Sequence, residues 1–296
     1  MKKTTSILLT LLLFVLYHCA TAEKLERART NPYWNDMALF LAGMPQRPES
    51  PFCEAAKTPH YARHVESMNT FWEKVRSKNI DTITSWRDAQ LHGLPRAKTA
   101  FYPFSGADLA NLYTFYPDAR TYVMIALEDA GPIPDPLKLT PAELAEGLSS
   151  IQRVIQSIAS RNYFHSAVMQ RELPNRYLPG TIPVLLIFAA RLGLAVSTLE
   201  LIGIDPSGNV VPLDAAYTIR GTPPAVTGAR IRFRAHGDGE PRTLVYLDMR
   251  LSDRVLDPSF AEGKFFRSLG PFDTLIKSAV YLLHRDGFVE LCSFML

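Results

Sequence analysis

The chain has little cysteine, little net charge and no long hydrophobic run. Its three cysteines, Cys19, Cys53 and Cys292, allow at most one disulfide within the chain. A net charge of +3 gives no electrostatic reason to expect a nucleic acid as a partner. The apolar runs Ile7–Tyr17 and Pro183–Val196 fall short of the ~20 residues that a membrane-spanning helix requires. We therefore predict that Pro183–Val196 is a buried helix and that the folded protein has no transmembrane span.

Three motifs that would name a reaction are also missing. The nucleophile elbow Gly-x-Ser-x-Gly is absent around Ser105, because proline and alanine stand at the two glycine positions. The dinucleotide fingerprint needs three glycines, and the corresponding turn has only Gly106. His60 and His64 are four residues apart, but Tyr-Ala-Arg between them lacks the glutamate of a zinc protease. We therefore predict no metal and no cofactor, and a surface position for this pair of histidines.

The first residues are typical of an exported protein. Two lysines begin the chain, the apolar run Ile7–Tyr17 follows, and residues 20–22 are Ala-Thr-Ala, the small residues that a signal peptidase requires. We predict a signal peptide over residues 1–22, cleaved after Ala22, and a secreted or periplasmic protein. Lipidation at Cys19 is not expected, because a histidine precedes it where a small residue is needed.

Cleavage at this site would leave two cysteines in an oxidising compartment. A bond between Cys53 and Cys292 would tie together the two ends of the mature chain. Two separate buried thiols are the alternative, and the sequence leaves both open.

The hydrophobic pattern predicts an α/β fold: a mixed sheet with flanking helices and C-terminal hairpins, preceded by a helical N-terminal segment. We divide the chain into the signal peptide (1–22), the helical segment (23–97) and the α/β domain (98–296), and expect 23–296 to form one folded unit. Proline-led entries, a capping box and apolar spacing mark the helices. The predicted helices lie at about 32–41, 59–75, 80–86, 107–116, 141–158, 182–192, 258–269 and 272–285.

The strands are predicted from short apolar or alternating runs. Thr99–Phe104 and Thr121–Leu127 flank the helix over 107–116 and give a strand–helix–strand unit. Ser197–Ile204 should reverse through a turn into a strand at 210–211, and a second hairpin should span Arg230–Arg250. No internal repeat is present.

Ser105 is the first candidate catalytic residue, because it stands on a tight turn between a strand and a helix. A serine there could be a nucleophile if a histidine activates it. The histidines considered as its base are His165, His236 and His284. The alternative is that Ser105 caps the following helix.

Asp108 and Glu128 are the second candidate pair, with Asp129 beside them. Paired carboxylates catalyse glycoside hydrolysis when their pKa values differ. The alternative is that Asp108 caps a helix and that the other two acids lie in a solvated turn.

Arg230, Arg232 and Arg234 alternate along a predicted strand, so their side chains share one face. They could bind a carboxylate, sulfate or phosphate through the planar guanidinium group. The alternative is a solvated face of the hairpin.

Four segments are similar to a family of uncharacterised exported bacterial proteins that carry a Tyr-Pro-Phe-Ser-Gly-x-Asp motif. They are residues 102–108 (Tyr-Pro-Phe-Ser-Gly-Ala-Asp), 115–117, 127–132 and 277–284. The resemblance implies an exported location and carries no known activity. Related chains have proline where Ala107 stands and continue past the last helix, which implies that this chain is a shortened copy.

Taken together, the sequence predicts an exported, non-catalytic protein that binds a small anion or a glycan. The first alternative is a hydrolase that uses Ser105 or the Asp108 and Glu128 carboxylates. The second is a structural protein of the cell envelope.

Overall fold

The structure is a computed structural model that describes residues 31–161, 173, 176–213, 224, 226–235, 237, 239–277 and 279–295. The predicted signal peptide with Cys19, and the histidines His165 and His236, lie outside these residues. The predicted α/β class is confirmed, because helices flank one mixed sheet of seven strands in the order β4-β3-β5-β6-β2-β1-β7. The strands are β1 (Thr99–Tyr102), β2 (Thr121–Ala126), β3 (Leu194–Ile204), β4 (Val210–Pro212), β5 (Thr227–Ala235), β6 (Pro241–Asp248) and β7 (Phe272–Thr274).

The sheet has a parallel half and an antiparallel half. Strands β6, β2, β1 and β7 run parallel, while β5 is antiparallel to both β6 and β3. The predicted hairpins β3–β4 and β5–β6 are confirmed, as is the parallel unit of β1, α6 (Leu109–Phe115) and β2. In parallel strands the carboxyl ends meet at one edge, so residues that follow β1, β2, β6 and β7 are brought together.

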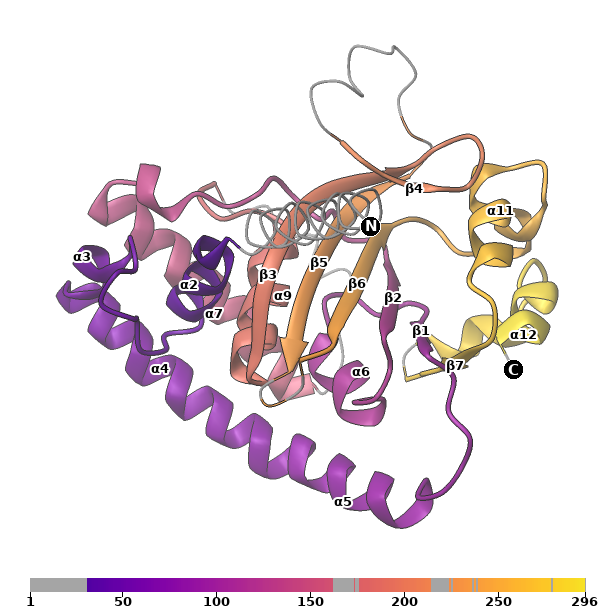
Figure 1. Ribbon diagram of the computed structural model, residues 1–296, viewed down its shortest axis with the longest axis horizontal. Helices are drawn as coiled ribbons and strands as arrows, with labels where there is room; N and C mark the ends of the chain where they lie inside the picture. Colours follow the sequence, from indigo (N-terminus) through magenta and orange to yellow (C-terminus); the bar gives the residue numbers. More distant parts are fainter. Residues whose placement is uncertain are drawn as a thin grey trace, which may run out of the picture.

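Helices cover both faces of the sheet. The larger core, on one face, joins the sheet to α2, α4, α6, α7 and α9, and the second core packs α11 and α12 on the other face. Figure 1 shows α2, α3 and α4 at one end of the long axis and α11 and α12 at the other. The remaining bounds are α2 (Pro32–Leu41), α3 (Cys53–Ala56), α4 (Pro59–Val75), α5 (Asp81–Gln90), α7 (Pro141–Arg161), α9 (Ile182–Arg191), α11 (Ala261–Ser268) and α12 (Val289–Met295).

The segment Pro183–Val196 forms the buried helix α9, in which every residue but Arg191 is buried, and then the start of β3. This run is apolar because the helix is buried in the protein core, so a position in a bilayer is not needed to explain it. Within the part of the chain that the structure describes, none of the helices has the length and apolar character needed to span a membrane.

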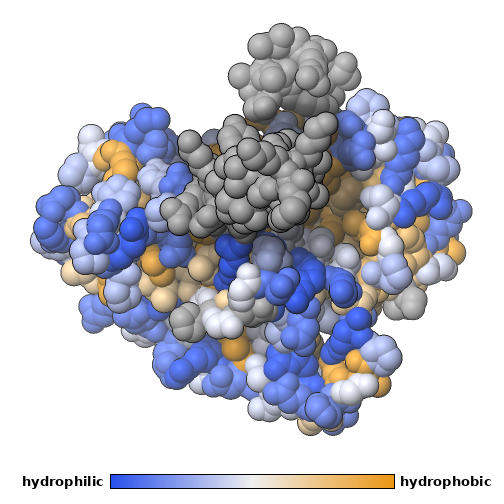
Figure 2. Space-filling view, viewed as in Figure 1, coloured by the Kyte–Doolittle hydropathy of each residue, from blue (hydrophilic) through white to orange (hydrophobic). Residues whose placement is uncertain are grey.

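Helix α4 begins as the sequence predicts. Thr58 caps it, with Oγ1 accepting a hydrogen bond from the amide of Tyr61 at 3.2 Å, and Pro59 occupies the first turn. The helix continues through a five-residue π-helix, η1 (Arg76–Ile80), into α5, and the three form one long rod (Figure 1). The surface over α3 and the start of α4 is mainly hydrophilic in the view of Figure 2.

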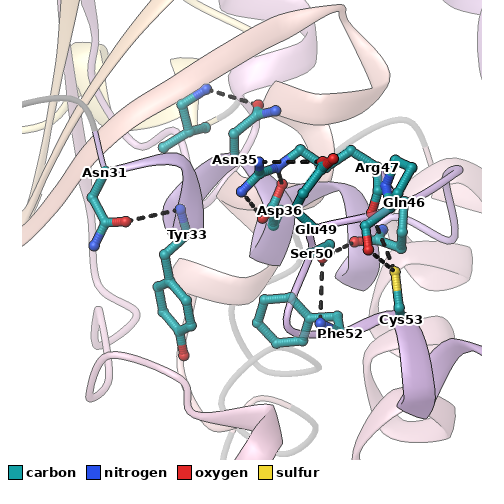
Figure 3. Close-up of polar contacts among 12 residues, drawn as sticks. Asn31, Tyr33, Asn35, Asp36, Gln46, Arg47, Glu49, Ser50, Phe52 and Cys53 are labelled. Carbon is teal, nitrogen blue, oxygen red and sulfur yellow. Dashed lines mark hydrogen bonds and ion pairs between the residues drawn. The ribbon is translucent and has the colours of Figure 1, made fainter. Parts of the chain in front are cut away.

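The loop after α2 is fixed by polar contacts (Figure 3). Arg47 binds the buried carboxylate of Asp36 through two hydrogen bonds, Nε to Oδ1 at 2.7 Å and Nη2 to Oδ2 at 2.8 Å. The thiol of Cys53 donates to the carbonyl of Arg47 at 3.2 Å. Cys53 and Cys292 are both free thiols, in α3 and α12 at opposite ends of the molecule (Figure 1), so the structure lacks the bond considered above.

One predicted helix is wrong. The apolar pattern predicts a helix over Phe272–Arg285, but Phe272–Thr274 forms β7 beside β1, and Val280–His284 makes a short 3-10 helix, η4. The amide of Leu275 donates to the carbonyl of Phe101 at 2.8 Å. Pairing with a distant strand therefore overrides the local helical pattern.

Candidate functional site

Ser105 lies on the tight turn between β1 and α6, as predicted, but its hydroxyl is not exposed. Phe104 and Gly106 on either side have positive φ angles of 53° and 56°. The Ser105 side chain is buried, and Oγ lies 2.9 Å from the carbonyl oxygen of Gly106 and 3.2 Å from that of Ile125. The hydroxyl therefore donates to backbone carbonyls and joins the turn to β2. It does not cap α6, so the capping alternative for Ser105 is wrong.

Among the residues that the structure describes, the Ser105 hydroxyl bonds backbone carbonyls and not a histidine. Of the three histidines considered as its base, His284 is described, and it is exposed on η4. A nucleophilic serine requires a base within hydrogen-bond reach. In this geometry Ser105 is placed as a structural link between β1 and β2.

Asp108 is the residue that caps α6. Its Oδ1 accepts from the amide of Asn111 at 3.4 Å and from Asn111 Nδ2 at 2.8 Å. Its Oδ2 accepts from the Tyr102 hydroxyl at 3.1 Å and from Lys277 Nζ at 2.8 Å. Asp108 is 2% exposed and Lys277 only partly buried. Burial and the neighbouring carboxylate raise the pKa of Tyr102 well above its ordinary value.

Removal of the Lys277 charge is expected to destabilise the fold. Lys277→Met would leave the buried Asp108 carboxylate with two uncharged partners, so we expect a loss of about 2 kcal/mol in the free energy of unfolding. Arg76→Met is the control, because Arg76 and Glu73 form a solvent-exposed ion pair at 3.0 Å, and exposed pairs contribute little to stability. Urea unfolding of both variants measures the loss in the free energy of unfolding. Equal losses would show that the buried Asp108–Lys277 pair stabilises the fold no more than the exposed Arg76–Glu73 pair does.

Glu128 and Asp129 follow β2, and Asp248 ends β6 directly opposite Ala126. Glu128 is buried and Asp129 exposed, so the predicted solvated turn is wrong for Glu128. The pKa of Asp248 is raised, first by burial and then by the charges of Asp129 and Glu128. A carboxyl group whose pKa is raised by burial and by neighbouring acids is a feature that acid catalysis uses.

The carboxyl edge thus brings together Ser105, Asp108 and Glu128 and adds residues that the sequence analysis missed. Asp248 lies at this edge because β6 pairs in parallel with β2. Lys277 lies there because it follows β7, which pairs in parallel with β1. A local signal for Asp248 existed: β2 and β6 are both apolar strands with an acid at or just past the end. Asp108 is neutralised by Lys277, so it is not free to pair with Glu128 as a catalytic acid.

The three arginines of β5 do not form an open anion-binding row. Arg230 forms an ion pair with Glu200 on β3, Nε to Oε1 at 2.7 Å. Arg234 donates from Nε to the carbonyl of Gly239 at 3.0 Å. Arg232 lies opposite Thr198 of β3 and is partly buried. Two of the three guanidinium groups are therefore engaged within the protein, one by β3 and one by the turn between β5 and β6.

The two histidines of α4 differ in environment, which corrects their predicted surface position. His60 is exposed, and its Nδ1 lies 2.6 Å from Arg63 Nη2. His64 is buried, with Nε2 at 2.8 Å from the carbonyl of Leu41 and Nδ1 at 2.7 Å from Gln152 Nε2. Burial lowers the pKa of His64 to about 4. Within the described ranges, no group of histidine, cysteine and acidic side chains could hold a metal ion.

A groove that the sequence analysis missed runs along α4 and reaches α7. Its volume is about 680 Å³, within the range of small-molecule sites. We call it the α4 groove. Its described lining includes Arg63, Glu66, Ser67, Thr70, Lys74, Lys78, Asn79 and Gln156 over the buried side chains of Phe71 and Val75. Helical spacing of about three to four residues places these polar groups in one stripe beside the buried stripe of α4.

Comparison with known proteins does not assign the chain to a family. No protein-family model matches the chain, and neither the curated proteins nor the solved structures contain a significant match. The resemblance of residues 102–108 to exported bacterial proteins stays a prediction. The fold and the groove define the class of protein: an α/β protein with a polar surface groove.

Proposed function

We propose that this chain is an exported protein that binds a small anion or a glycan, with the ligand in the α4 groove. The single observation that carries the proposal is the groove itself, which combines a volume of about 680 Å³ with three cationic side chains. The ammonium groups of Lys74 and Lys78 have no acidic partner among the residues that the structure describes. Cations that are not neutralised within the protein are available to an anionic ligand.

The export part of the proposal is supported by the basic start, the apolar run and the Ala-Thr-Ala sequence at residues 20–22. Binding is favoured over hydrolysis for two reasons. The Ser105 hydroxyl is buried and donates to carbonyl oxygens. Asp108 forms an ion pair with Lys277.

Filling the groove should abolish binding. Thr70→Trp places an indole in the middle of the groove from an exposed position on α4, so the fold should tolerate it. Thr82→Trp, exposed on α5 and outside the groove lining, is the matched control. We expect the wild type and T82W to bind at least one member of a panel of acidic and neutral oligosaccharides, sulfate and phosphate. T70W should lose at least about tenfold in affinity, or 1.4 kcal/mol.

Thermal unfolding must first show that both variants fold as the wild type does. Undiminished binding by T70W would move the site away from the groove. Release of reducing ends from any oligosaccharide in the panel would instead support the hydrolase alternative. No binding at all would leave the structural envelope protein as the better description.

A further inference from the structure

The cations of the α4 groove are spread along it. Arg63 and Lys78 are 15 positions apart, which corresponds to about 22 Å along a helix axis. No single carboxylate or phosphate can contact both side chains across that span. Arg63 is also held at its own end, because its Nη2 lies 2.6 Å from His60 Nδ1, one turn further from Lys74. A ligand that uses both ends of the groove must therefore be extended.

The middle of the groove has a different chemistry. Glu66 is exposed there, between Arg63 and Lys74, and it is followed by the hydroxyl groups of Ser67 and Thr70. A carboxylate accepts hydrogen bonds and repels other anions, whereas a hydroxyl group both donates and accepts. This stretch therefore suits uncharged hydroxyl groups and disfavours a ligand with negative charge at every unit.

The far end of the groove concentrates positive charge next to an irregular turn. Lys74 and Lys78 are four residues apart, on the last turn of α4 and in the π-helix η1. π-helices are rare and are frequent at functional sites. Asn79 of the same π-helix and Gln156 of α7 also line the groove, so amide groups stand beside the two lysines.

We propose that the ligand of the α4 groove is an acidic oligosaccharide several sugars long. Acid groups meet Arg63 at one end and Lys74 and Lys78 at the other, and uncharged hydroxyl groups lie over Glu66, Ser67 and Thr70. The inference rests on the proposed function, because it names the ligand class of that same groove. Because Glu66 repels negative charge in the middle of the groove, the proposal excludes a uniformly charged polyanion such as polyphosphate or a nucleic acid.

The test is isothermal titration calorimetry of the intact protein with four probes. They are hyaluronan oligosaccharides of two to eight sugars, with an acid on every second sugar; neutral chitin oligosaccharides; free glucuronate; and inorganic polyphosphate. We expect affinity to rise about tenfold or more between the hyaluronan disaccharide and the hexasaccharide, because the longer chain contacts both ends at once. Chitin oligosaccharides, glucuronate and polyphosphate should each bind at least about tenfold more weakly than the hexasaccharide.

Three variants locate the contacts. Lys74→Gln with Lys78→Gln should weaken hexasaccharide binding about tenfold, while Lys57→Gln, exposed beside Glu54 and outside the groove lining, should leave it unchanged. Glu66→Gln should strengthen polyphosphate binding about threefold and leave hexasaccharide binding no stronger than before. Unfolding curves that match the wild type establish that each variant is folded.

The outcomes separate the two proposals. Affinity independent of chain length, equal binding of chitin oligosaccharides, or polyphosphate bound as tightly as the hexasaccharide would each overturn the acidic oligosaccharide. In those cases binding that T70W abolishes would still support the groove as a ligand site. If no probe binds and the wider panel also fails, both proposals fall.

Discussion

Gly131→Ala is expected to destabilise the fold by about 4 kcal/mol or more, because two backbone segments cross at this glycine. A Cβ at Gly131 would lie 2.5 Å from the carbonyl oxygen of Pro179, and its φ of +77° is unfavourable for any other residue. Gly180 on the facing segment has the same constraint, since its Cβ would lie 2.4 Å from the carbonyl of Ala130. The amide of Thr181 donates to the carbonyl of Asp129 across the crossing at 3.1 Å. A methyl group would separate the segments and break such bonds.

Gly193→Ala is the matched control. Gly193 also has a positive φ, +74°, but no atom within 4 Å of the position its Cβ would take. It should therefore lose only the conformational term of about 1–2 kcal/mol. Thermal and urea unfolding of both variants give the two losses in the free energy of unfolding. Their difference is the part that comes from the steric clash at Gly131. A loss for G131A no larger than that for G193A would mean that the two backbones do not cross in contact.

The second large effect is a loss of stability at acid pH that originates at His64. The folded protein holds this imidazole neutral, with a pKa of about 4 against an ordinary value of 6.5. Between these values the unfolded chain binds a proton that the folded chain does not, so stability falls as the pH is lowered from about 6.5 to 4. The His64 contribution to this fall amounts to about 3 kcal/mol. Above the ordinary pKa of histidine, the contribution of His64 to stability is fully present.

The surroundings of His64 explain the direction of this shift. The ring is buried between α4, the end of α2 and α7, where its hydrogen-bond partners are the carbonyl of Leu41 and the amide of Gln152. Burial has the largest effect, and the positive charge of Arg191 adds to it. The hydrogen bond to Leu41 opposes the shift and is outweighed.

The measurement compares urea unfolding from pH 4 to 7 for the wild type and His64→Gln. The stability difference between them should change by about 3 kcal/mol over this range. His60→Gln is the control, because it makes the same change on the same helix at an exposed ring. A parallel pH dependence for the wild type and H64Q would contradict the assignment.

Local sequence determined most of the secondary structure. Thr58-Pro59 defines the start of α4, and the apolar spacing along its 17 residues already shows its buried face, because side chains every three or four residues share a helix face. The run Thr121–Leu127 predicted a strand covered on both sides, and β2 is buried from Tyr122 to Ala126. Short turns similarly identified the β3–β4 and β5–β6 hairpins.

The sequence also identified part of the carboxyl edge but not the roles of its residues. Ser105, Asp108 and Glu128 do meet at one end of the parallel strands. Which hydroxyl is buried, and which acid is neutralised, depends on residues far away in the chain. Lys277 reaches Asp108 across 169 positions, and this contact decides that Asp108 is a paired carboxylate.

The amino-acid sequence by itself therefore determined the α/β class, the main helices and the two hairpins, because these follow from periodicity and capping among near neighbours. Only the tertiary structure decided that Phe272–Thr274 is a strand, that Asp248 joins Glu128 and Asp129, and that α4 and α7 enclose a groove. The physical reason is that strand pairing, burial and charge neutralisation are interactions between segments. Their partners are set by the packing of the whole chain, which no local pattern records.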